Sequence, residues 1–519
     1  MILRLSKTLL LRCRCNRNYY SHRVWDSQVA TNPGAPVLIS IDLGTTRLKV
    51  VAFDAGGTLL AQEAVRNREH HDNHLAWQDP NEWWADTCEL IQRLLSRPEL
   101  EERDISGLSL SGRGGAAVFV DREGKALSPS WSDRRHASEL AALAAWRTGE
   151  AHLSNYGMAL IAKLTWLRHN DPLTAEQVAH AMYAKDFILF RLTGAVITDP
   201  TSGPDAPLWD STALAHASVD SAVLPTVAMP WELAGEVSAD AARQCGLPAG
   251  TPVATGAHDG ICANVGAGAG AVGTVAITVG THAVVRAVMA EQPEDAYRFY
   301  GMPPDREIIG GNAVMAGRGA DWFIDGWLGH TSSEQRADTL AEMDSEAASV
   351  RVGAGGVLFL PFLQGQVAPE ARPDAAASFA GLRSDHGRAE MYRAVLEGGA
   401  FAIRGIFEQV RHWCGDPSLV RFTGSGARSA IWRQIIVDSL RWPVESTDAA
   451  AEGRGAAIYL ATALRYHPNV DAAEVAMVPQ ATLIEPDSAA ADLYDSIYAR
   501  WIRLSDAMRP LDEETSTTL

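Results

Sequence analysis

The sequence predicts an α/β fold built from two domains, and three observations indicate it. The chain has 519 residues, more than a single hydrophobic core usually serves. Segments with strand character alternate with segments of helical periodicity along both halves. One pattern, a strand, a glycine-threonine turn and a second strand, occurs at 37–53 and again at 274–289. We interpret this repeat as a duplicated domain in which each copy contributes one such turn.

Three strands open the first half. Residues 37–41 are an apolar run, residues 48–53 are rich in β-branched side chains, and residues 59–65 follow a turn at 55–58. The turn between the first two strands carries the sequence Gly-Thr-Thr at 44–46. The chain is therefore expected to open as an antiparallel meander.

Helices and further strands follow in order. A helix at 81–96 is expected because Asp79-Pro80 is a typical helix start. The other expected helices are 137–146, 159–169, 388–414, 430–440 and 455–464. The other expected strands are 107–110, 117–120, 252–255, 274–279, 283–289 and 419–422. Residues 198–208, rich in Thr, Ser, Pro and Asp, predict a loop. The domain boundary is expected near 253–256, giving domains at 35–254 and 255–508 and a tail at 509–519.

The net charge, the length of the apolar runs and the cysteine spacing each argue against certain classes of protein. The formal net charge of −18 argues against binding nucleic acid, for which a basic face is expected. No apolar run reaches the roughly 18–20 residues that span a membrane. The six cysteines lack paired C-x-x-C spacing, so buried or incidental thiols are expected in place of a metal site or disulfides. These features indicate a cytoplasmic protein that has neither nucleic acid nor a membrane as partner.

Residues 1–34 differ from the rest of the chain. They carry several Arg and Lys side chains and no acid before Asp26. An Arg-rich, acid-poor start is typical of an organelle transit peptide. A disordered tail, or a start site assigned too early, would look the same. We exclude residues 1–34 from the expected fold and expect the fold to form without them.

Asp42 ends the first strand directly before the Gly44-Thr45-Thr46 turn. A glycine turn lets backbone N–H groups approach phosphate oxygens, and the threonine hydroxyls add donors. The carboxylate beside this turn could hold Mg²⁺ through water. The alternative is a plain β-turn in which Asp42 satisfies its own backbone.

Asp259 lies in the sequence Gly-Ala-His-Asp-Gly at 256–260. Flanking glycines allow a substrate to come close, and the carboxylate could take the proton from an attacking hydroxyl. The alternative is a helix N-cap, because residues 261–267 could begin a helix. For His258, a packed histidine beside the site is the more ordinary interpretation than a ligand.

Gly424 and Gly426 join an expected strand to an expected helix, an arrangement that suits a nucleotide or its phosphates. The third glycine of the dinucleotide fingerprint is missing, which argues against a Rossmann dehydrogenase. The sequence contains no G-x-x-x-x-G-K-[ST], which excludes the ordinary P-loop enzymes.

Five segments together resemble the FGGY carbohydrate kinases, in the sugar kinase/actin/Hsp70-like ATPase superfamily. They are the phosphate motif at 42–46, the stretch W-Q-D-P-N-E-W-W at 77–84 that is similar to the family's W-x-Q-D-P-x-x-W-W, the W-x-D-x-R segment at 131–135, the C-terminal signature within 377–397 and the adenosine motif at 424–432. The similarity covers about residues 37–505. It implies two actin-like (ribonuclease H-like) domains with a catalytic cleft between them.

The resemblance also implies roles for single residues. Asp259 would be the general base that deprotonates a carbohydrate hydroxyl, and Asp42 would position Mg²⁺ through water, with ATP as donor. The other implied ATP and phosphate contacts are Gly44, Thr45, Thr46, Gly280, Thr281, Gly310, Gly311, Gly424, Gly426, Ala427 and Ser429. The implied substrate contacts are Trp77, Arg113, Gly114, Asp133, His258 and Asp259.

The stretch Ser-Gly-Arg-Gly-Gly at 111–115 departs from the family. Members that act on xylulose tend to carry a Met-His pair after Ser-Gly-Gln. Here Arg113 takes the Gln position, and the two glycines after it would leave room. An arginine at the mouth of a sugar pocket could pair with a carboxylate, which favours a sugar acid. Arg113 could instead pair with Asp133 or Asp259.

The predicted function is therefore ATP-dependent phosphorylation of a terminal hydroxyl on a small sugar, sugar acid or polyol, xylulose- or gluconate-like. This carbohydrate is the expected partner, and a homodimer is compatible with the sequence. The alternative is an ATPase or sensor module of the same superfamily without a sugar acceptor. Asp259 and the W-x-Q-D-P stretch count against it, since a sensor needs no acceptor pocket. A catalytically dead relative is disfavoured because Asp42 and Asp259 are both present.

Overall fold

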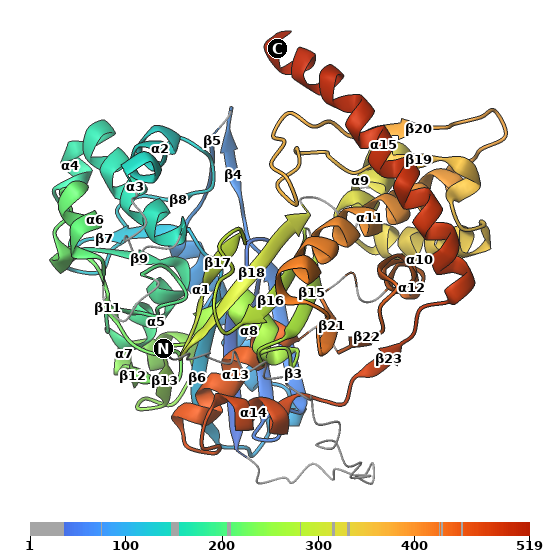
Figure 1. Ribbon diagram of the computed structural model, residues 1–519. Helices are drawn as coiled ribbons and strands as arrows, with labels where there is room; N and C mark the ends of the chain where they lie inside the picture. Colours follow the sequence, from blue (N-terminus) through green and yellow to red (C-terminus); the bar gives the residue numbers. More distant parts are fainter. Residues whose placement is uncertain are drawn as a thin grey trace, which may run out of the picture.

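The computed structural model describes residues 36–73, 75–146, 155–204, 209–280, 282–313, 317–329, 333–424, 426, 429–447 and 450–518. The extension at 1–34 lies outside these ranges, and so do two predicted site residues, Thr281 and Ala427. Two large mixed sheets organise the described chain (Figure 1).

The first sheet has seven strands within the described residues, in the order β12-β13-β6-β1-β2-β3, with β14 also paired to β6. β1 runs antiparallel to β2 and parallel to β6. The strands are β1 (Val37–Leu43), β2 (Arg47–Asp54), β3 (Leu59–Arg66), β6 (Ile105–Gly112), β12 (Leu233–Glu236), β13 (Pro252–Ala254) and β14 (Ala257–His258).

The second sheet repeats these strand directions. Its described strands follow the order β17-β18-β16-β15-β21-β22-β23, and β15 runs antiparallel to β16 and parallel to β21. The strands are β15 (Thr274–Val279), β16 (Ala283–Met289), β17 (Arg298–Met302), β18 (Arg306–Ala313), β21 (Leu419–Thr423), β22 (Val444–Ser446) and β23 (Thr482–Ile484). The shared topology agrees with the duplicated pattern expected from the sequence, and the α/β prediction is confirmed.

Helices pack on the outer face of each sheet. On the first sheet they are α1 (Pro80–Leu95), α5 (Ala184–Thr193) and α7 (Ala239–Cys245). On the second they are α9 (Gly319–Phe323), α10 (Ser333–Ser349), α11 (Arg388–Cys414), α12 (Ala430–Leu440) and α15 (Ser488–Thr518). The start of α1 follows the predicted signal, since Asp79 caps the helix and Pro80 opens it.

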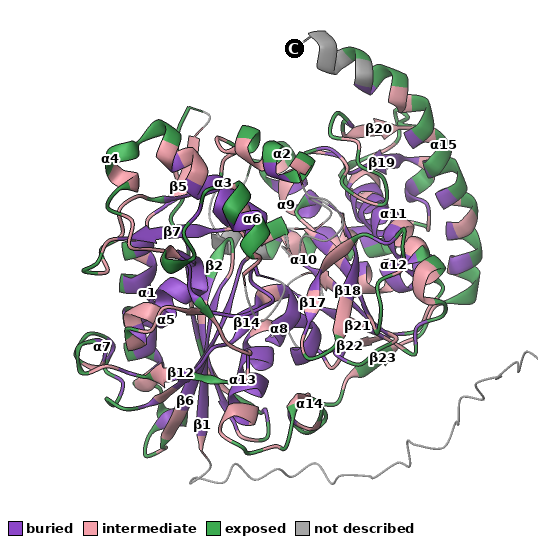
Figure 2. Cartoon of the chain, turned by 60° about the vertical axis from the view of Figure 1, so that its left-hand side comes forward, coloured by how far each residue is buried: buried purple, intermediate pink, exposed green. Residues whose placement is uncertain are grey.

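Two helices, α8 (Asp259–Gly266) and α13 (Ala451–Ala463), lie between the sheets. Their apolar side chains form one cluster with the inner faces of both sheets, and α8 and the first sheet appear as buried in Figure 2. A Cβ on Gly266 would lie 1.8 Å from the carbonyl oxygen of Ala451, and one on Gly455 would lie 2.0 Å from that of Cys262. Glycine at these two positions therefore allows the helix backbones to touch.

A side lobe extends from the first half of the chain (upper left in Figure 1) and has its own apolar cluster. Its helices are α2 (Ala137–Trp146), α3 (Asn155–Asn170), α4 (Pro172–Ala175) and α6 (Ser211–His216), with the 3-10 turn η2 (Ser221–Val223). Its short strands are β7 (Ala117–Val120), β8 (Ser130–Trp131), β9 (His180–Tyr183), β10 (Ile197–Thr198) and β11 (Thr226–Val227).

The remaining elements connect these parts. They are β4 (His70–Asp72), β5 (Leu75–Gln78), β19 (Leu358–Leu360), β20 (Ser378–Ala380), α14 (Val470–Met477), the π-helical turn η3 (Ile324–Leu328) and the 3-10 turns η1 (Pro98–Leu100) and η4 (Ala354–Gly356). The segment expected as a tail continues α15 to Thr518, and Arg372 pairs with Asp512 on it at 2.9 Å. The predicted loop at 198–208 is a turn after β10 as far as residue 204.

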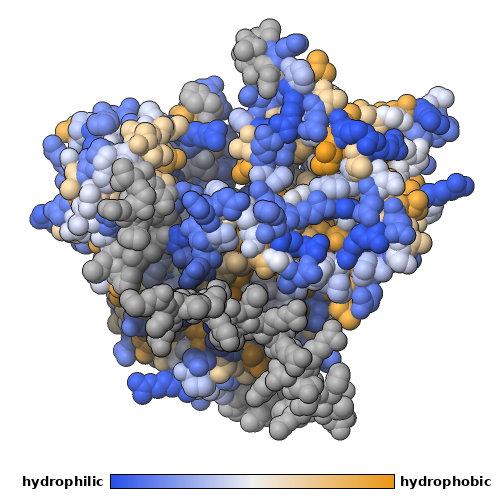
Figure 3. All heavy atoms as spheres, in the orientation of Figure 1, coloured by the Kyte–Doolittle hydropathy of each residue, from blue (hydrophilic) through white to orange (hydrophobic). Residues whose placement is uncertain are grey.

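One face of the molecule is mostly polar. On the face shown in Figure 3, hydrophilic side chains dominate and apolar ones are scattered among them. None of the helices in the described ranges is long and apolar enough to cross a membrane.

Candidate active site

Asp42 and Asp259 meet at one edge of the first sheet. Asp42 on β1 lies opposite Ser111 on β6, and Ala257 on β14 lies opposite the same Ser111 from the other side. Adjacent strands are about 4.8 Å apart, so the backbones of Asp42 and Ala257 are roughly 10 Å apart. Because β14 pairs with β6, both acids come from the first sheet.

The carboxylate of Asp42 is buried and paired. Ser111 donates to its Oδ1 at 2.9 Å, and Lys49 Nζ lies 3.1 Å from its Oδ2. Burial raises the pKa of Asp42 to about 6; Lys49 opposes this rise, and Glu452 and Asp259 add to it. Asp42 is thus held by neighbouring strands and not by its own backbone. Sequence reasoning missed Lys49, although the antiparallel register of β1 and β2 places it directly opposite Asp42.

Side-chain hydrogen bonds hold the backbone of the Gly-Thr-Thr turn in place. The carbonyl of Thr45 accepts hydrogen bonds from Asn67 Nδ2 at 3.1 Å, from Gln78 Nε2 at 3.3 Å and from Arg113 Nη1 at 3.3 Å. The side chains of Thr45 and Thr46 are exposed. Three donors therefore hold the turn while its two hydroxyls remain accessible. The supporting roles of Asn67 and Gln78 were not predicted.

Arg113 is a buried cation with an unusual set of partners. Its Nη2 donates to Gln78 Oε1 at 3.1 Å, and its guanidinium lies 5.2 Å from the centre of the Trp83 ring. Its Nε is buried without a hydrogen-bond partner. Burial lowers the pKa of Arg113 to about 10, so it remains charged near neutral pH. The ion pairs of the described residues include none between Arg113 and Asp133 or Asp259.

Trp77 and Asp133 lie where the side lobe joins the first sheet. Trp77 on β5 pairs with Trp131 on β8. The Asp133 carboxylate accepts the N–H of Ala76 at 2.9 Å and pairs with Arg135 at 2.5 Å. Both residues predicted to contact substrate are thus near each other, and Asp133 is already engaged by an arginine.

His258 and Asp259 form the start of α8. The N-cap is His258, not Asp259 as the alternative interpretation had it, because His258 Nδ1 accepts the N–H of Gly260 at 3.0 Å. This bond leaves the proton on Nε2, which lies 3.3 Å from Asp259 Oδ1. Burial lowers the pKa of His258, so the ring is neutral. His258 therefore orients an acid whose side chain is 29% exposed.

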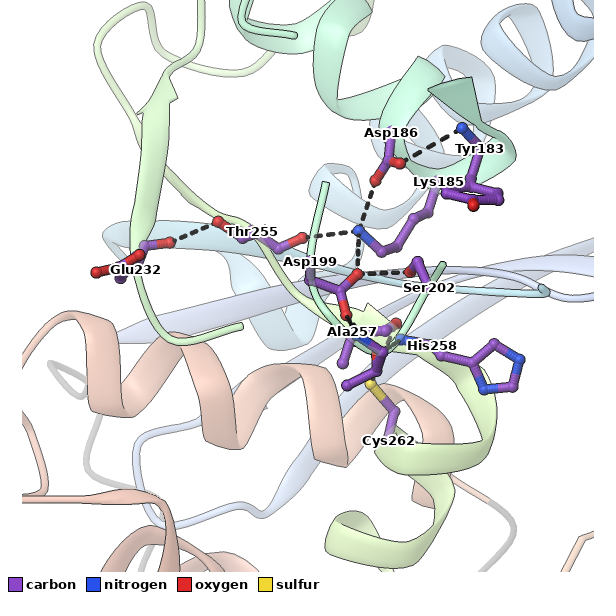
Figure 4. A network of polar contacts seen from close by, with 11 residues as sticks. Tyr183, Lys185, Asp186, Asp199, Ser202, Glu232, Thr255, Ala257, His258 and Cys262 are labelled. Carbon is purple, nitrogen blue, oxygen red and sulfur yellow. Dashed lines mark hydrogen bonds and ion pairs between the residues drawn. The ribbon is translucent and has the colours of Figure 1, made fainter. Parts of the chain in front are cut away.

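A buried ionic network supports this corner (Figure 4). Lys185 Nζ lies 2.6 Å from Asp186 Oδ1 and 2.8 Å from Asp199 Oδ2. Asp199 accepts the N–H of Thr201 at 2.8 Å, and the hydroxyl of Thr201 accepts the N–H of His258 at 2.9 Å. The network thus connects α5 and the turn after β10 to the backbone of His258. The sequence alone did not reveal it.

Gly114 does not leave room, contrary to the expectation. A Cβ on Gly114 would lie 2.6 Å from three ring carbons of Tyr156, so this ring already covers Gly114. Tyr156 opens α3 and was not among the predicted site residues. Lys163 on the same helix donates to the carbonyls of Gly115 and Trp131, both at 2.9 Å.

The burial of Lys163 gives a pH-dependent prediction. Burial, together with the charge of Arg113, lowers the pKa of Lys163 to about 7. The unfolded chain then binds more protons between about pH 7 and about 10, so the free energy of unfolding should rise with pH in this window. Lys163→Gln should reduce that slope by up to about 1.4 kcal/mol per pH unit in urea unfolding measured at pH 7, 8 and 9. Equal slopes for the two proteins would contradict the prediction.

In the second sheet, three predicted glycines come together. Gly280 follows β15, and a Cβ there would meet nothing within 4 Å. Cβ atoms on Gly424 and Gly426 would lie 2.4 Å and 2.5 Å from atoms of Val279, the last residue of β15. The parallel pairing of β15 with β21 brings these turns together at the carboxyl ends of both strands.

Three other residues predicted to bind nucleotide, Ser429, Gly310 and Gly311, make structural contacts in the described chain. The hydroxyl of Ser429 accepts the N–H of Trp432 at 3.2 Å and so caps α12. Gly310 and Gly311 lie within β18, where a Cβ on Gly311 would be 2.7 Å from Ala368 Cβ. Gly310 and Gly311 therefore allow close packing inside the second half of the chain.

Comparison with known proteins covers most of the chain. Residues 37–266 match the sequence model of the N-terminal domain of the FGGY family of carbohydrate kinases, and residues 275–464 match that of its C-terminal domain.

Individual relatives agree. A xylulose kinase from Staphylococcus epidermidis is 26% identical over 89% of this chain and 95% of its own length. A gluconokinase from Bacillus subtilis is 26% identical over 77% of this chain and 82% of its own length. The crystal structure of ligand-bound xylulose kinase from Lactobacillus acidophilus superimposes with a TM-score of 0.80 at 22% identity, covering 91% of this chain and 98% of that one, a similarity of fold.

Proposed function

This chain belongs to the FGGY family of carbohydrate kinases, and from that premise we propose that it transfers the γ-phosphoryl group of ATP to a terminal hydroxyl of a small sugar, sugar acid or polyol. The relatives named as xylulose kinase and gluconokinase support a xylulose- or gluconate-like acceptor.

One observation carries the proposal. The pairing of β1, β6 and β14 brings Asp42 and Asp259 to one sheet edge, beside an anchored turn with exposed threonine hydroxyls. Phosphoryl transfer depends mainly on positioning and on charge stabilisation, and these groups suit both.

In the proposed step, the acceptor hydroxyl loses its proton to Asp259 as its oxygen bonds to the γ-phosphorus. The bond from that phosphorus to the bridging oxygen breaks, and ADP leaves. His258 holds the Asp259 carboxylate through its Nε2 proton. Lys49 and the backbone of the threonine turn offer positive charge and N–H donors to the transferred group.

The residues fit a magnesium ion bound through water and phosphate. No group of three His, Cys, Asp or Glu side chains able to hold a metal is found within the described residues. Mg²⁺ commonly takes one or two carboxylates and fills its other positions with water and substrate phosphates. Asp42 would supply the carboxylate that holds the ion, and the ion would neutralise charge on the phosphates.

The acceptor class is tested by ADP release with Mg-ATP against ketopentoses, polyols and aldonic acids. A strong response to an acid, with an acceptor KM that rises about tenfold or more in Arg113→Ala while the KM for ATP stays unchanged, would establish a sugar-acid kinase; tenfold corresponds to about 1.4 kcal/mol of lost charge-assisted contact. A response only to neutral acceptors would show that Arg113 does not recognise an acid, while the proposed kinase activity would stand. ADP release independent of every acceptor would overturn the proposal in favour of the ATPase or sensor module.

A further inference from the structure

Tyr156 takes the space that a side chain at position 114 would otherwise fill. Three of its ring carbons lie 2.6 Å from the position of a Cβ on Gly114, and one ring carbon lies 3.5 Å from that on Gly115. Contacts under 3.0 Å are essentially absent from real structures, so a side chain at 114 and this ring exclude each other. Gly115 also has a φ of +74°, which favours glycine.

The ring of Tyr156 also stacks on His258, beside Asp259. The centroids of Tyr156 and His258 are 4.8 Å apart and the ring planes differ by 24°. Tyr300 on β17 of the second sheet lies 4.7 Å from His258 on another side. Burial raises the pKa of Tyr156, and the nearby Tyr300 and the Asp259 carboxylate add to the rise, so its hydroxyl lies within the field of Asp259.

Three elements thus meet at this ring: the 113–115 turn after β6, the start of α8, and α3 of the side lobe. Tyr156 packs against the apolar cluster of the side lobe and also against the cluster between the sheets. It is only half-buried, so part of the side chain remains accessible.

Resting on the proposed function, we propose that Tyr156 is a specificity-determining wall of the acceptor pocket. Glycine at 114 admits the ring. The ring would take an acceptor that places a carbon–hydrogen face against it and a terminal hydroxyl at Asp259. Small polyhydroxylated chains have both features, because each carbon carries hydrogen beside its hydroxyl. Aromatic side chains commonly line such pockets while a few polar groups fix the orientation.

The test is a double-mutant cycle on Tyr156 and Gly114. Tyr156→Ala should raise the acceptor KM about tenfold or more, equivalent to about 1.4 kcal/mol of lost contact, with little change in the KM for ATP. Tyr156→Phe should recover most of that loss. Gly114→Ala should also raise the acceptor KM, because the added methyl displaces the ring. In the Tyr156→Ala background, Gly114→Ala should have little further effect, since its obstacle is gone.

Phe190→Ala is the matched control. The Phe190 ring lies 2.7 Å from the position of a Cβ on Gly124, the same kind of aromatic-on-glycine contact in the same half of the chain. It should lower Tm and leave the acceptor KM unchanged. An unchanged acceptor KM in Tyr156→Ala, with a lowered Tm, would overturn the inference and leave a merely structural role. If the unmodified protein phosphorylates no acceptor, the proposed function fails instead. The Tm values of the three single variants and the double variant then still test whether the Tyr156 ring packs on Gly114.

Discussion

Asp259→Asn should reduce acceptor-dependent ADP release by about 10²–10⁴-fold while nucleotide binding persists. The amide keeps the shape of the side chain and can still contact His258, but it cannot accept the proton of the acceptor hydroxyl. Three glycines expected to contact the nucleotide, Gly280, Gly424 and Gly426, lie at the ends of β15 and β21, on the other sheet. The measurement is single-turnover phosphoryl transfer together with the Tm shift caused by Mg-ADP.

The matched control is Glu123→Gln, which makes the same chemical change at an exposed turn. It should leave both quantities unchanged. A loss of less than tenfold in Asp259→Asn would contradict the general-base role. Loss of the Mg-ADP shift along with activity would contradict the expectation that nucleotide binding persists, because the substitution would then disturb folding or nucleotide binding.

Lys185→Met should lower the free energy of unfolding by about 3–5 kcal/mol, because it leaves two buried carboxylates without their cation. The Lys185 side chain is 1% exposed, as is that of Asp186, and Asp199 is 0% exposed. The same change should lower kcat, since Asp199 and Thr201 hold the backbone N–H of His258. Urea unfolding and steady-state kinetics check the two effects.

Two further variants separate the causes. Adding Asp199→Asn to Lys185→Met should recover part of the lost stability, because it removes one unpaired charge. Arg243→Met, which breaks an ion pair with Asp240 whose side chains are 70% and 68% exposed, should cost at most about 1 kcal/mol. If Lys185→Met costs no more than this surface variant, the network does not stabilise the fold as described.

Much of the fold could be predicted because local signals agreed with the tertiary structure. The strands at Thr274–Val279 and Ala283–Met289 and the helix Arg388–Cys414 have their expected bounds. Each of these elements has an unbroken hydrophobic periodicity or a clear turn at its ends. The start of α3 at Asn155 and of α13 at Ala451 came earlier than expected. The first residue of α13 packs on Gly266 of α8, a contact that no local pattern near Ala451 indicates.

The site was less predictable, since its acids are local features but their environment is not. Asp42 and Asp259 stand in recognisable glycine motifs. Tyr156 lies 42 positions after Gly114, and nothing in the sequence near either residue indicates that one covers the other. The same holds for Lys185 with Asp199. Long-range contacts of this kind become visible only once strand order and the path of the side lobe are known.

The helix pair between the sheets has a consequence for protein synthesis. The inner face of the first sheet, including Leu38, Val51 and Phe53, packs against α13, whose residues 451–463 are translated some 400 positions later. Until that helix leaves the ribosome, an apolar surface on the earliest strands has no permanent cover. The first sheet can therefore complete its folding only after α13, near the C-terminus, has been synthesised. Nascent chains stopped before residue 451 should depend on chaperones to stay in solution.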